Sequence, residues 1–226
     1  MSRATQLAAL AEGIVSCRRC PRLVEWREQV ASEKVARFAD QDYWGRPVPG
    51  FGDPDATVLA LGLAPAAHGA NRTGRNFTGD RSGDFLYASM HRTGFANQPT
   101  SVAADDGLTL RGMWVSAVNR CAPPGNRPSP EERDNCLPFL SREISVLSEL
   151  RVVVALGSFA WDGAWRAITA LGHSAKPKPR FGHGVEADIG PFMLIGCFHP
   201  SQQNTFTGRL TPDMLDTVLV RARTIA

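Results

Sequence analysis

Four short segments of the chain are apolar at almost every position, and longer segments with many polar residues separate them. The apolar runs span residues 57–62, 113–118, 151–156 and 192–197. A short apolar run without the alternation of a half-exposed strand is typical of a strand buried on both faces. The pattern therefore predicts a central sheet of four strands that is mainly parallel.

The segments between these runs carry helix signals. Helices are expected over residues 3–13, 23–38, 84–93 and 158–171, from Ser129-Pro130 onward, and from Thr211-Pro212 onward. Ser129 suits an N-cap, and proline and acidic residues suit the first turn after it. The last helix has one apolar face, formed by Leu215, Val218, Leu219 and Ala222. The alternation of strands and helices predicts an α/β protein, a three-layer α/β/α domain around the sheet.

Glycine and proline mark the expected loops. Residues 44–54 are predicted to form a loop, and residues 173–191 a loop or a hairpin. The long glycine-rich segment from Gly62 to Gly83 has little hydrophobic periodicity, and such segments in compact domains are usually functional. Sites in parallel sheets lie beyond the carboxyl ends of the strands. The Gly62 loop and the loop that starts at His199 should therefore meet in one cleft.

Composition and charge narrow the class of protein. The chain has 226 residues, of which 43% are hydrophobic and 21% charged, and this balance suits one globular domain over residues 1–226. A net charge of +3 permits a polyanionic partner but does not require one. No segment resembles a membrane span or a secretion signal, so a cytoplasmic location with reduced thiols is expected.

Four of the five cysteines have a spacing typical of a metal or iron–sulfur site. Cys17 and Cys20 form a C-x-x-C pair, and Cys121 and Cys136 follow far along the chain. Four thiolates suit a structural zinc ion or a four-iron cluster, and spacing does not choose between them. Buried free thiols are the alternative, and this is the preferred interpretation of Cys197, which lies inside the fourth apolar run.

The loop from Gly62 to Asp80 carries groups that suit a planar or anionic ligand. Its glycines allow a close backbone approach, and its Asn, Arg and Thr side chains can donate hydrogen bonds. It is not a P-loop, because the Gly-Lys-Ser/Thr ending is missing. Phe77, among polar neighbours, is either a stacking platform or an anchor of the loop. His199, just past a buried strand, is either a donor to an anion in the cleft or a structural histidine.

The two loops and the cysteines together resemble the uracil-DNA glycosylase superfamily, specifically the B-type enzymes grouped as family five. The glycine-rich loop resembles their first active-site motif, and His199-Pro-Ser-x-x-Asn-x-x-Thr-Gly-Arg resembles their second. The likeness covers nearly the whole chain in order. It implies a monofunctional uracil-DNA glycosylase of base excision repair that binds damaged DNA, of bacterial or archaeal type and nucleoid-associated when bound. We expect it to act as a monomer.

The resemblance also implies that the four cysteines hold a 4Fe-4S cluster rather than zinc. Cys17 and Cys20 would belong to an N-terminal iron–sulfur-ligating segment of the domain, and Cys121 and Cys136 to later parts of it. The resemblance further implies that Phe77 stacks on the extruded base, that Asp80 holds or polarises the attacking water, and that His199 donates to the base oxygen. For Asp80 the alternative is an acidic residue that favours the start of the coming helix. The expected substrate-binding set is completed by Gly62, Ala64, His68, Asn119, Asn204, Thr207 and Arg209. The last three belong to a loop expected to touch DNA and fill the gap left by the flipped nucleotide.

Two departures from the related four-type enzymes predict a wider range of bases. Those enzymes have a glutamate after the initial glycine of the first motif, where this chain has Leu63. They read uracil with an asparagine at the position of Ala117, whereas here the nearest one is Asn119. A site that merely lacks a donor discriminates weakly between isosteres. We therefore expect hypoxanthine and ethenocytosine to be substrates as well.

Three alternative functions can be weighed from the residues alone. A non-catalytic metal-cluster module that binds nucleic acid would share the cysteines and the basic charge. A variant that captures uracil covalently would carry an inserted basic loop ending in histidine after the first motif, and none is seen around residues 80–84. An α/β hydrolase would carry a Gly-x-Ser-x-Gly turn, which this chain lacks.

Overall fold

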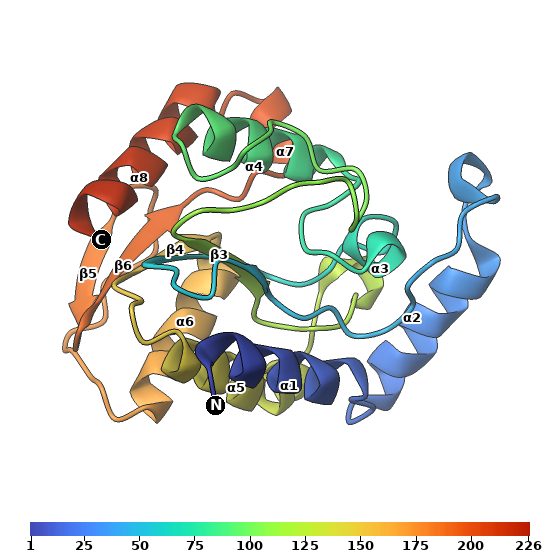
Figure 1. The fold of residues 1–226 in the computed structure, drawn as a ribbon, viewed down its shortest axis with the longest axis horizontal. Helices are drawn as coiled ribbons and strands as arrows, with labels where there is room; N and C mark the ends of the chain where they lie inside the picture. Colours follow the sequence, from blue (N-terminus) through green and yellow to red (C-terminus); the bar gives the residue numbers. More distant parts are fainter.

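A six-stranded sheet forms the centre of the computed structural model, which describes residues 1–226 (Figure 1). The strand order is β1-β3-β2-β4-β6-β5. The four predicted strands are the inner four: β2 (Val58–Gly62), β3 (Met113–Ala117), β4 (Val152–Leu156) and β6 (Phe192–Cys197). They are parallel to one another, with Gly62 opposite Ala117 where β2 and β3 end. The prediction of a mainly parallel sheet is therefore confirmed.

The predicted number of four strands is wrong, because an antiparallel strand is added at each edge. These edge strands are β1 (Phe51–Gly52), paired with β3, and β5 (Glu186–Ile189), paired with β6. β1 lies in the segment 44–54 that was expected to be a loop, and two residues give no periodic pattern. β5 forms a hairpin with β6, which was one of the two alternatives for residues 173–191.

Helices cover both faces of the sheet (Figure 1). The first face carries α1 (Arg3–Val15), α5 (Pro130–Val146) and α6 (Ser158–Ala170), and the second carries α4 (Arg81–Arg92) and α8 (Pro212–Ile225). The strands supply both cores by alternation: Leu59 and Leu61 of β2 face the first layer of helices, and Val58 and Ala60 face the second. This arrangement confirms the three-layer α/β/α prediction. None of the helices has the length and apolar character that crossing a bilayer requires.

The predicted helix over residues 23–38 is interrupted. The structure has α2 (Pro21–Glu33) and a separate 3₁₀ turn, η1 (Ala36–Phe38), which lie to one side of the sheet (Figure 1). The break occurs because Lys34 adopts a positive φ of 54° and Val35 is extended. Neither residue is a recognised helix breaker, so composition gave no signal. Three further short helices lie in predicted loops: α3 (Ala70–Thr73), η2 (Pro124–Asn126) and α7 (Gln202–Phe206).

A buried ion pair fixes α5 to the end of β3. Arg120 Nη2 lies 2.7 Å from Glu143 Oε2, and the hydroxyl of Ser116 donates to the same oxygen at 2.7 Å. Both charged side chains are almost fully buried. The pair therefore holds the segment that continues into Cys121 against the helix that carries Cys136, and it keeps two of the predicted ligands on one side of the sheet.

Candidate active site

The two predicted loops meet at the carboxyl edge of the sheet, as expected, and enclose a cavity of about 250 Å³. Its lining is formed by Leu63, Ala64, Ala66, Asn76, Phe77, Asp80, Ser82, Asn126, His199 and Ser201. Pockets for drug-sized ligands usually exceed roughly 300 Å³. The cavity therefore suits a smaller ligand, and the mixture of aromatic, carboxylate, amide and imidazole groups suits one that is planar and polar.

Phe77 and His199 face this cavity from different loops, with their ring centroids 5.9 Å apart and their planes inclined by 34°. Both rings can thus contact a single planar ligand of pyrimidine size. The ring of Phe77 packs over the end of β2, where a Cβ atom at Gly62 would lie 2.7 Å from Phe77 Cζ. Glycine at position 62 is therefore required for this placement of the ring.

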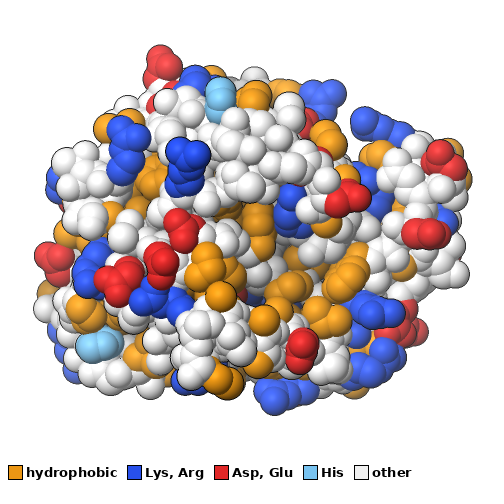
Figure 2. Space-filling view, in the orientation of Figure 1, with side chains coloured by type: hydrophobic (Ala, Val, Ile, Leu, Met, Phe, Trp, Pro, Cys, Tyr) orange, Lys and Arg blue, Asp and Glu red, His pale blue; other side chains and the backbone are white.

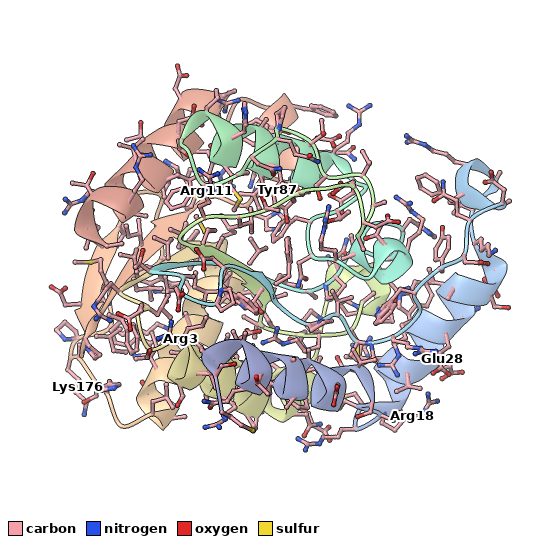
Figure 3. All side chains as sticks on the ribbon, in the orientation of Figure 1. Arg3, Arg18, Glu28, Tyr87, Arg111 and Lys176 are labelled. Atoms are coloured by element: carbon pink, nitrogen blue, oxygen red, sulfur yellow. The ribbon has the colours of Figure 1, made fainter.

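Phe77 has an unusual backbone conformation, with a φ of +53°. A bulky residue in this left-handed region costs roughly 1–3 kcal/mol and persists only where its surroundings hold it there. Contacts of the preceding residue help to fix this conformation: Asn76 Nδ2 donates to the carbonyl of Pro49 at 2.9 Å. Tyr87, which points from α4 into the interior (Figure 3), donates its hydroxyl to the carbonyl of Asn76 at 2.9 Å.

Asp80 both lines the cavity and caps α4. Its Oδ1 accepts a hydrogen bond of 2.9 Å from the N–H of Gly83, so the helix begins at Arg81 rather than at residue 84. The other carboxylate oxygen lies against Gly69, where any Cβ would overlap it. Burial raises the pKa of Asp80, and the N–H groups of Gly83 and Ser82 oppose this shift. Asp80 therefore both caps the helix and lines the cavity, so the two interpretations of this residue are compatible.

His199 lies two residues after the end of β6. Its backbone is fixed by Asn204, whose Nδ2 donates to the carbonyl of His199 at 2.9 Å. Burial lowers the pKa of His199 to about 4, because a site shielded from water disfavours the charged imidazolium. The ring is therefore neutral near pH 7. A neutral imidazole has one N–H donor, which can point at an oxygen of the ligand.

Comparison with known proteins identifies the family. A family model described as "Uracil DNA glycosylase superfamily" matches residues 49–223. The chain belongs to this superfamily. A type-5 uracil-DNA glycosylase of Mycobacterium tuberculosis is 58% identical over 212 residues, which is 93% of this chain and 78% of the relative. One from Thermus thermophilus is 48% identical over 219 residues, 96% of this chain and 97% of the relative.

A type-4 uracil-DNA glycosylase of Thermotoga maritima is less similar, with 31% identity over 160 residues, 68% of this chain and 69% of the relative. Within the uracil-DNA glycosylase superfamily, the chain is thus a type-5 member, as the sequence motifs indicated. The family model begins after Cys17 and Cys20, whereas the type-5 relatives match 93–96% of this chain.

The other residues predicted for the site fall into two groups. The first group consists of Ala64, His68 and Asn119, which lie before α7 in the sequence. Ala64 lines the cavity, but His68 does not, and its Nδ1 lies 3.1 Å from the hydroxyl of Tyr43. Asn119 is also outside the lining. It is fully buried, its N–H donates to the carbonyl of Leu63 at 3.0 Å, and neither atom of its side-chain amide has a partner.

The second group belongs to α7 and the turn after it, and none of its members lines the cavity. Asn204 supports His199, and the hydroxyl of Thr207 donates to the carbonyl of Gln203 at 2.6 Å. The guanidinium of Arg209 lies 4.5 Å from the ring centroid of Phe198. Phe206 was not predicted, yet it is 69% exposed and has the guanidinium of Arg81 5.5 Å from its ring centroid.

Four polar residues of the cavity were missed by sequence reasoning: Asn76, Ser82, Asn126 and Ser201. Asn76 and Ser201 adjoin predicted site residues, so their place in the motifs could have indicated them. Asn126 has no such signal. It lies in η2, inside the proline-rich loop between Cys121 and Cys136, and only the fold brings that loop to the cavity.

The four predicted ligand cysteines line one small pocket away from the cavity. Arg27 donates from Nη1 to Cys121 Sγ at 2.9 Å, and Asn135 donates to Cys20 Sγ at 3.6 Å. Arg18, between the cysteines of the C-x-x-C pair, forms an ion pair with Glu28 of α2 (Figure 3). No three Cys, His, Asp or Glu side chains are arranged to hold a single metal ion.

Cys197 is not part of that pocket. It lies at the end of β6, fully buried in the second core, and burial raises the pKa of its thiol to about 12. A buried thiol that stays protonated is a small apolar group, which agrees with the sequence interpretation of Cys197 as a core residue.

The pKa of His199 gives a direct test of the site's electrostatics. Since burial lowers that pKa to about 4, the ring should stay neutral from roughly pH 8 down to pH 5.5 and take up a proton only as the pH falls further. The ring-nitrogen chemical shifts of ¹⁵N-histidine-labelled protein report this, and the His199→Gln variant assigns the signal. A His199 ring that becomes charged above pH 6 would contradict the account.

Proposed function

We propose that the protein removes uracil from DNA by hydrolysing the N-glycosidic bond, as a monofunctional glycosylase that starts base excision repair. The observation that carries this proposal is the cavity in which the Phe77 and His199 rings lie 5.9 Å apart with Asp80 in the same lining. Relatives that match over most of the chain are named type-5 uracil-DNA glycosylases, which supports the same activity.

Binding begins with extrusion of the base, because the glycosidic bond inside a duplex is out of reach. Flipping costs a few kcal/mol, least at mispairs and damaged bases. Stacking on an aromatic ring returns ~1–3 kcal/mol, so the ring of Phe77 offsets much of that cost. On the face shown in Figure 2, basic and acidic side chains are intermixed. Attraction to phosphates is independent of sequence, so selectivity for the base has to come from the cavity.

Bond cleavage moves negative charge onto the leaving base and leaves a cationic sugar. The neutral His199 ring can donate its N–H to the base oxygen as that charge builds. A fixed donor of this kind lowers the barrier by roughly 3–4 kcal/mol, or two to three decades of rate. Asp80 would hold the water that attacks the sugar, using the carboxylate oxygen that the helix cap leaves free.

We infer a range of bases beyond uracil. Leu63 lines the cavity at the position where the type-4 enzymes have a glutamate. Ala117 stands where they have an asparagine, and alanine has no carboxamide to read the base. The backbone N–H of Asn119 donates to the carbonyl of Leu63, but its fully buried side chain lies outside the cavity lining. A base in the cavity therefore meets no carboxamide at this edge, and a site that lacks such a donor discriminates weakly between isosteres. These features favour loose discrimination, with hypoxanthine and ethenocytosine accepted.

We further propose that the four cysteines hold a 4Fe-4S cluster. Four thiolates from one pocket suit such a cluster, and the buried guanidinium of Arg27 would balance part of their negative charge. When bound, the cluster would supply a cross-link between the N-terminal segment, the loop after β3 and helix α5. It would take no part in the base chemistry.

The roles of the two catalytic candidates predict an order of effects. Wild-type protein should convert a uracil-containing duplex to an abasic product, measured under single-turnover conditions. His199→Ala should slow this by about two to three decades. Asp80→Asn should cost less, because leaving-group stabilisation comes first in a dissociative path and asparagine still caps the helix.

The reverse order of these two effects would overturn the assignment of roles. A wild-type protein that shifts the DNA in a gel but yields no abasic site would instead support a non-catalytic nucleic-acid-binding module.

The proposed base range predicts that a duplex with hypoxanthine is cleaved after alkaline treatment, as the uracil duplex is. His199→Ala should slow both reactions, because one site serves both bases. A matched duplex with adenine is the control. Rapid removal of uracil with hypoxanthine left untouched would exclude the wider range.

Phe206 is an exposed aromatic side chain inside the motif that begins at His199, and we expect it to fill the gap in the duplex. Phe206→Ala should lower the rate on double-stranded DNA by about tenfold, the size of one lost stacking contact of roughly 1–3 kcal/mol, and should change the rate on single-stranded DNA little. Val220→Ala, at another exposed apolar residue, is the control. Equal losses on both substrates would contradict a gap-filling role.

The cluster proposal predicts about four iron atoms per chain in the purified protein and a broad visible absorption. Cys136→Ser should lose most of both, while Cys197→Ser should keep them, since Cys197 lies outside the pocket. Metal analysis that finds one zinc per chain and no iron would refute the assignment.

A further inference from the structure

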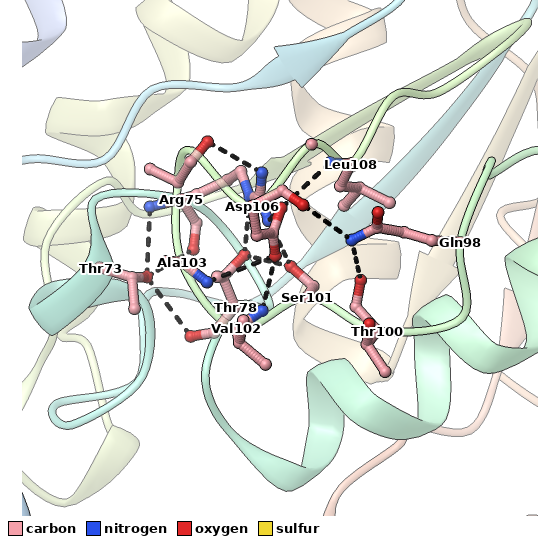
Figure 4. Close-up of polar contacts among 12 residues, drawn as sticks. Thr73, Arg75, Thr78, Gln98, Thr100, Ser101, Val102, Ala103, Asp106 and Leu108 are labelled. Atoms are coloured by element: carbon pink, nitrogen blue, oxygen red, sulfur yellow. Dashed lines mark hydrogen bonds and ion pairs between the residues drawn. The ribbon is translucent and has the colours of Figure 1, made fainter.

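The left-handed conformation of Phe77 needs support from outside its own loop. The residues on either side of it are buried: Arg75 is 7% exposed, Asn76 1% and Thr78 0%. Asn76 is fixed by hydrogen bonds to the carbonyl of Pro49 and from the hydroxyl of Tyr87. Arg75 and Thr78 are fixed by hydrogen bonds to residues 98–108 (Figure 4). This segment lies between α4 and β3 and lines no part of the cavity.

Arg75 uses all three nitrogens of its guanidinium in this contact. Its Nε donates to Thr78 Oγ1 at 3.0 Å, and its Nη1 donates to the carbonyl of Ala104 at 3.0 Å. Its Nη2 donates to Ser101 Oγ at 2.8 Å and to Asp106 Oδ1 at 2.7 Å. The first of these bonds spans Phe77, since it joins the residues at positions 75 and 78. The guanidinium therefore fixes the length and the direction of the turn that holds the ring.

Asp106 organises the other side of this contact. Its Oδ2 accepts from the N–H of Val102 at 2.7 Å, and its Oδ1 accepts from the N–H of Leu108 at 3.1 Å (Figure 4). Burial would raise the pKa of Asp106, but Arg75 and the backbone donors outweigh burial and the pKa lies below its ordinary value. The carboxylate is therefore charged at neutral pH and folds the segment around the guanidinium.

The chain after Phe77 is tied to the same segment. The hydroxyls of Thr78 and Ser101 are 2.7 Å apart, and the N–H of Gly79 donates to the carbonyl of Ser101 at 2.8 Å. The 98–108 segment thus grips the loop both before and after the aromatic residue. A rigid fork such as the guanidinium holds several acceptors in fixed directions, which a flexible ammonium does not.

We propose that the Arg75–Asp106 pair is a positioning device for Phe77, through which the 98–108 segment keeps the aromatic ring in the pose that stacks on the extruded base. The inference rests on the proposed function, in which Phe77 performs that stacking. Arg75 touches no part of the cavity and acts only through the ring.

The test is a double-mutant cycle of Arg75→Lys and Phe77→Ala, with single-turnover excision of uracil from a duplex as the measurement. Arg75→Lys should slow wild-type protein by about ten- to a hundredfold, the range expected for a small misplacement of a binding group. In the Phe77→Ala background the same change should cost less than about twofold, because the ring that it positions is gone. Asp106→Asn, which keeps the side-chain volume, should behave in the same way if Arg75→Lys folds poorly.

The control is Arg92→Lys, which removes the contact between another arginine–aspartate pair, Arg92 and Asp216 on α4 and α8, away from the Phe77 loop. It should leave the rate unchanged in both backgrounds. An Arg75→Lys cost that persists without the Phe77 ring, or no cost at all, would overturn the positioning role. If Phe77→Ala itself has no effect on excision, the stacking role in the proposed function fails instead, and the two failures are thereby distinguished.

Discussion

The parallel register of the four inner strands is the constraint on which the rest of this molecule depends. It brings Gly62, at the end of β2, level with Ala117, at the end of β3. β6 joins the same set through β4, so His199 leaves the sheet at the same edge. Three loops that are far apart in sequence therefore emerge side by side, and the cavity is the space between them. The absence of a Cβ at Gly62 then lets an aromatic ring lie over the strand end.

The sequence predicted most of this framework because the physics behind it is local. Strands buried on both faces produce uninterrupted apolar runs, and Ser129 with Pro130 produced a recognisable helix start that the structure confirms with a capping box. The elements that were missed leave weak local traces. β1 has two residues, β5 has only four, which is too short a stretch for a clear alternating pattern, and the end of α2 depends on the backbone angles of Lys34 rather than on its identity.

The candidate site divides in the same way. The motifs located Phe77, Asp80 and His199, because aromatic, acidic and imidazole groups in glycine-rich loops after strands are informative by themselves. Other features depend on side-chain partners that no pattern shows. Asn204 supports the backbone of His199 instead of facing outward, and Asn126 reaches the cavity only through the folding of a distant loop. Even Arg75, inside the first motif, reveals its partner Asp106 only in three dimensions.

Asp80 shows how tightly structure and chemistry are joined here. One carboxylate group ends a loop, starts a helix and faces the ligand space. Two requirements, capping the helix and facing the ligand, therefore limit which side chains are tolerated at that position. Drift toward alanine would unravel the first turn of α4 as well as remove a polar group from the pocket, whereas asparagine or serine would preserve the turn. A lineage that abandoned the reaction could keep this residue for architectural reasons alone, so its presence in a distant descendant is no proof of surviving activity.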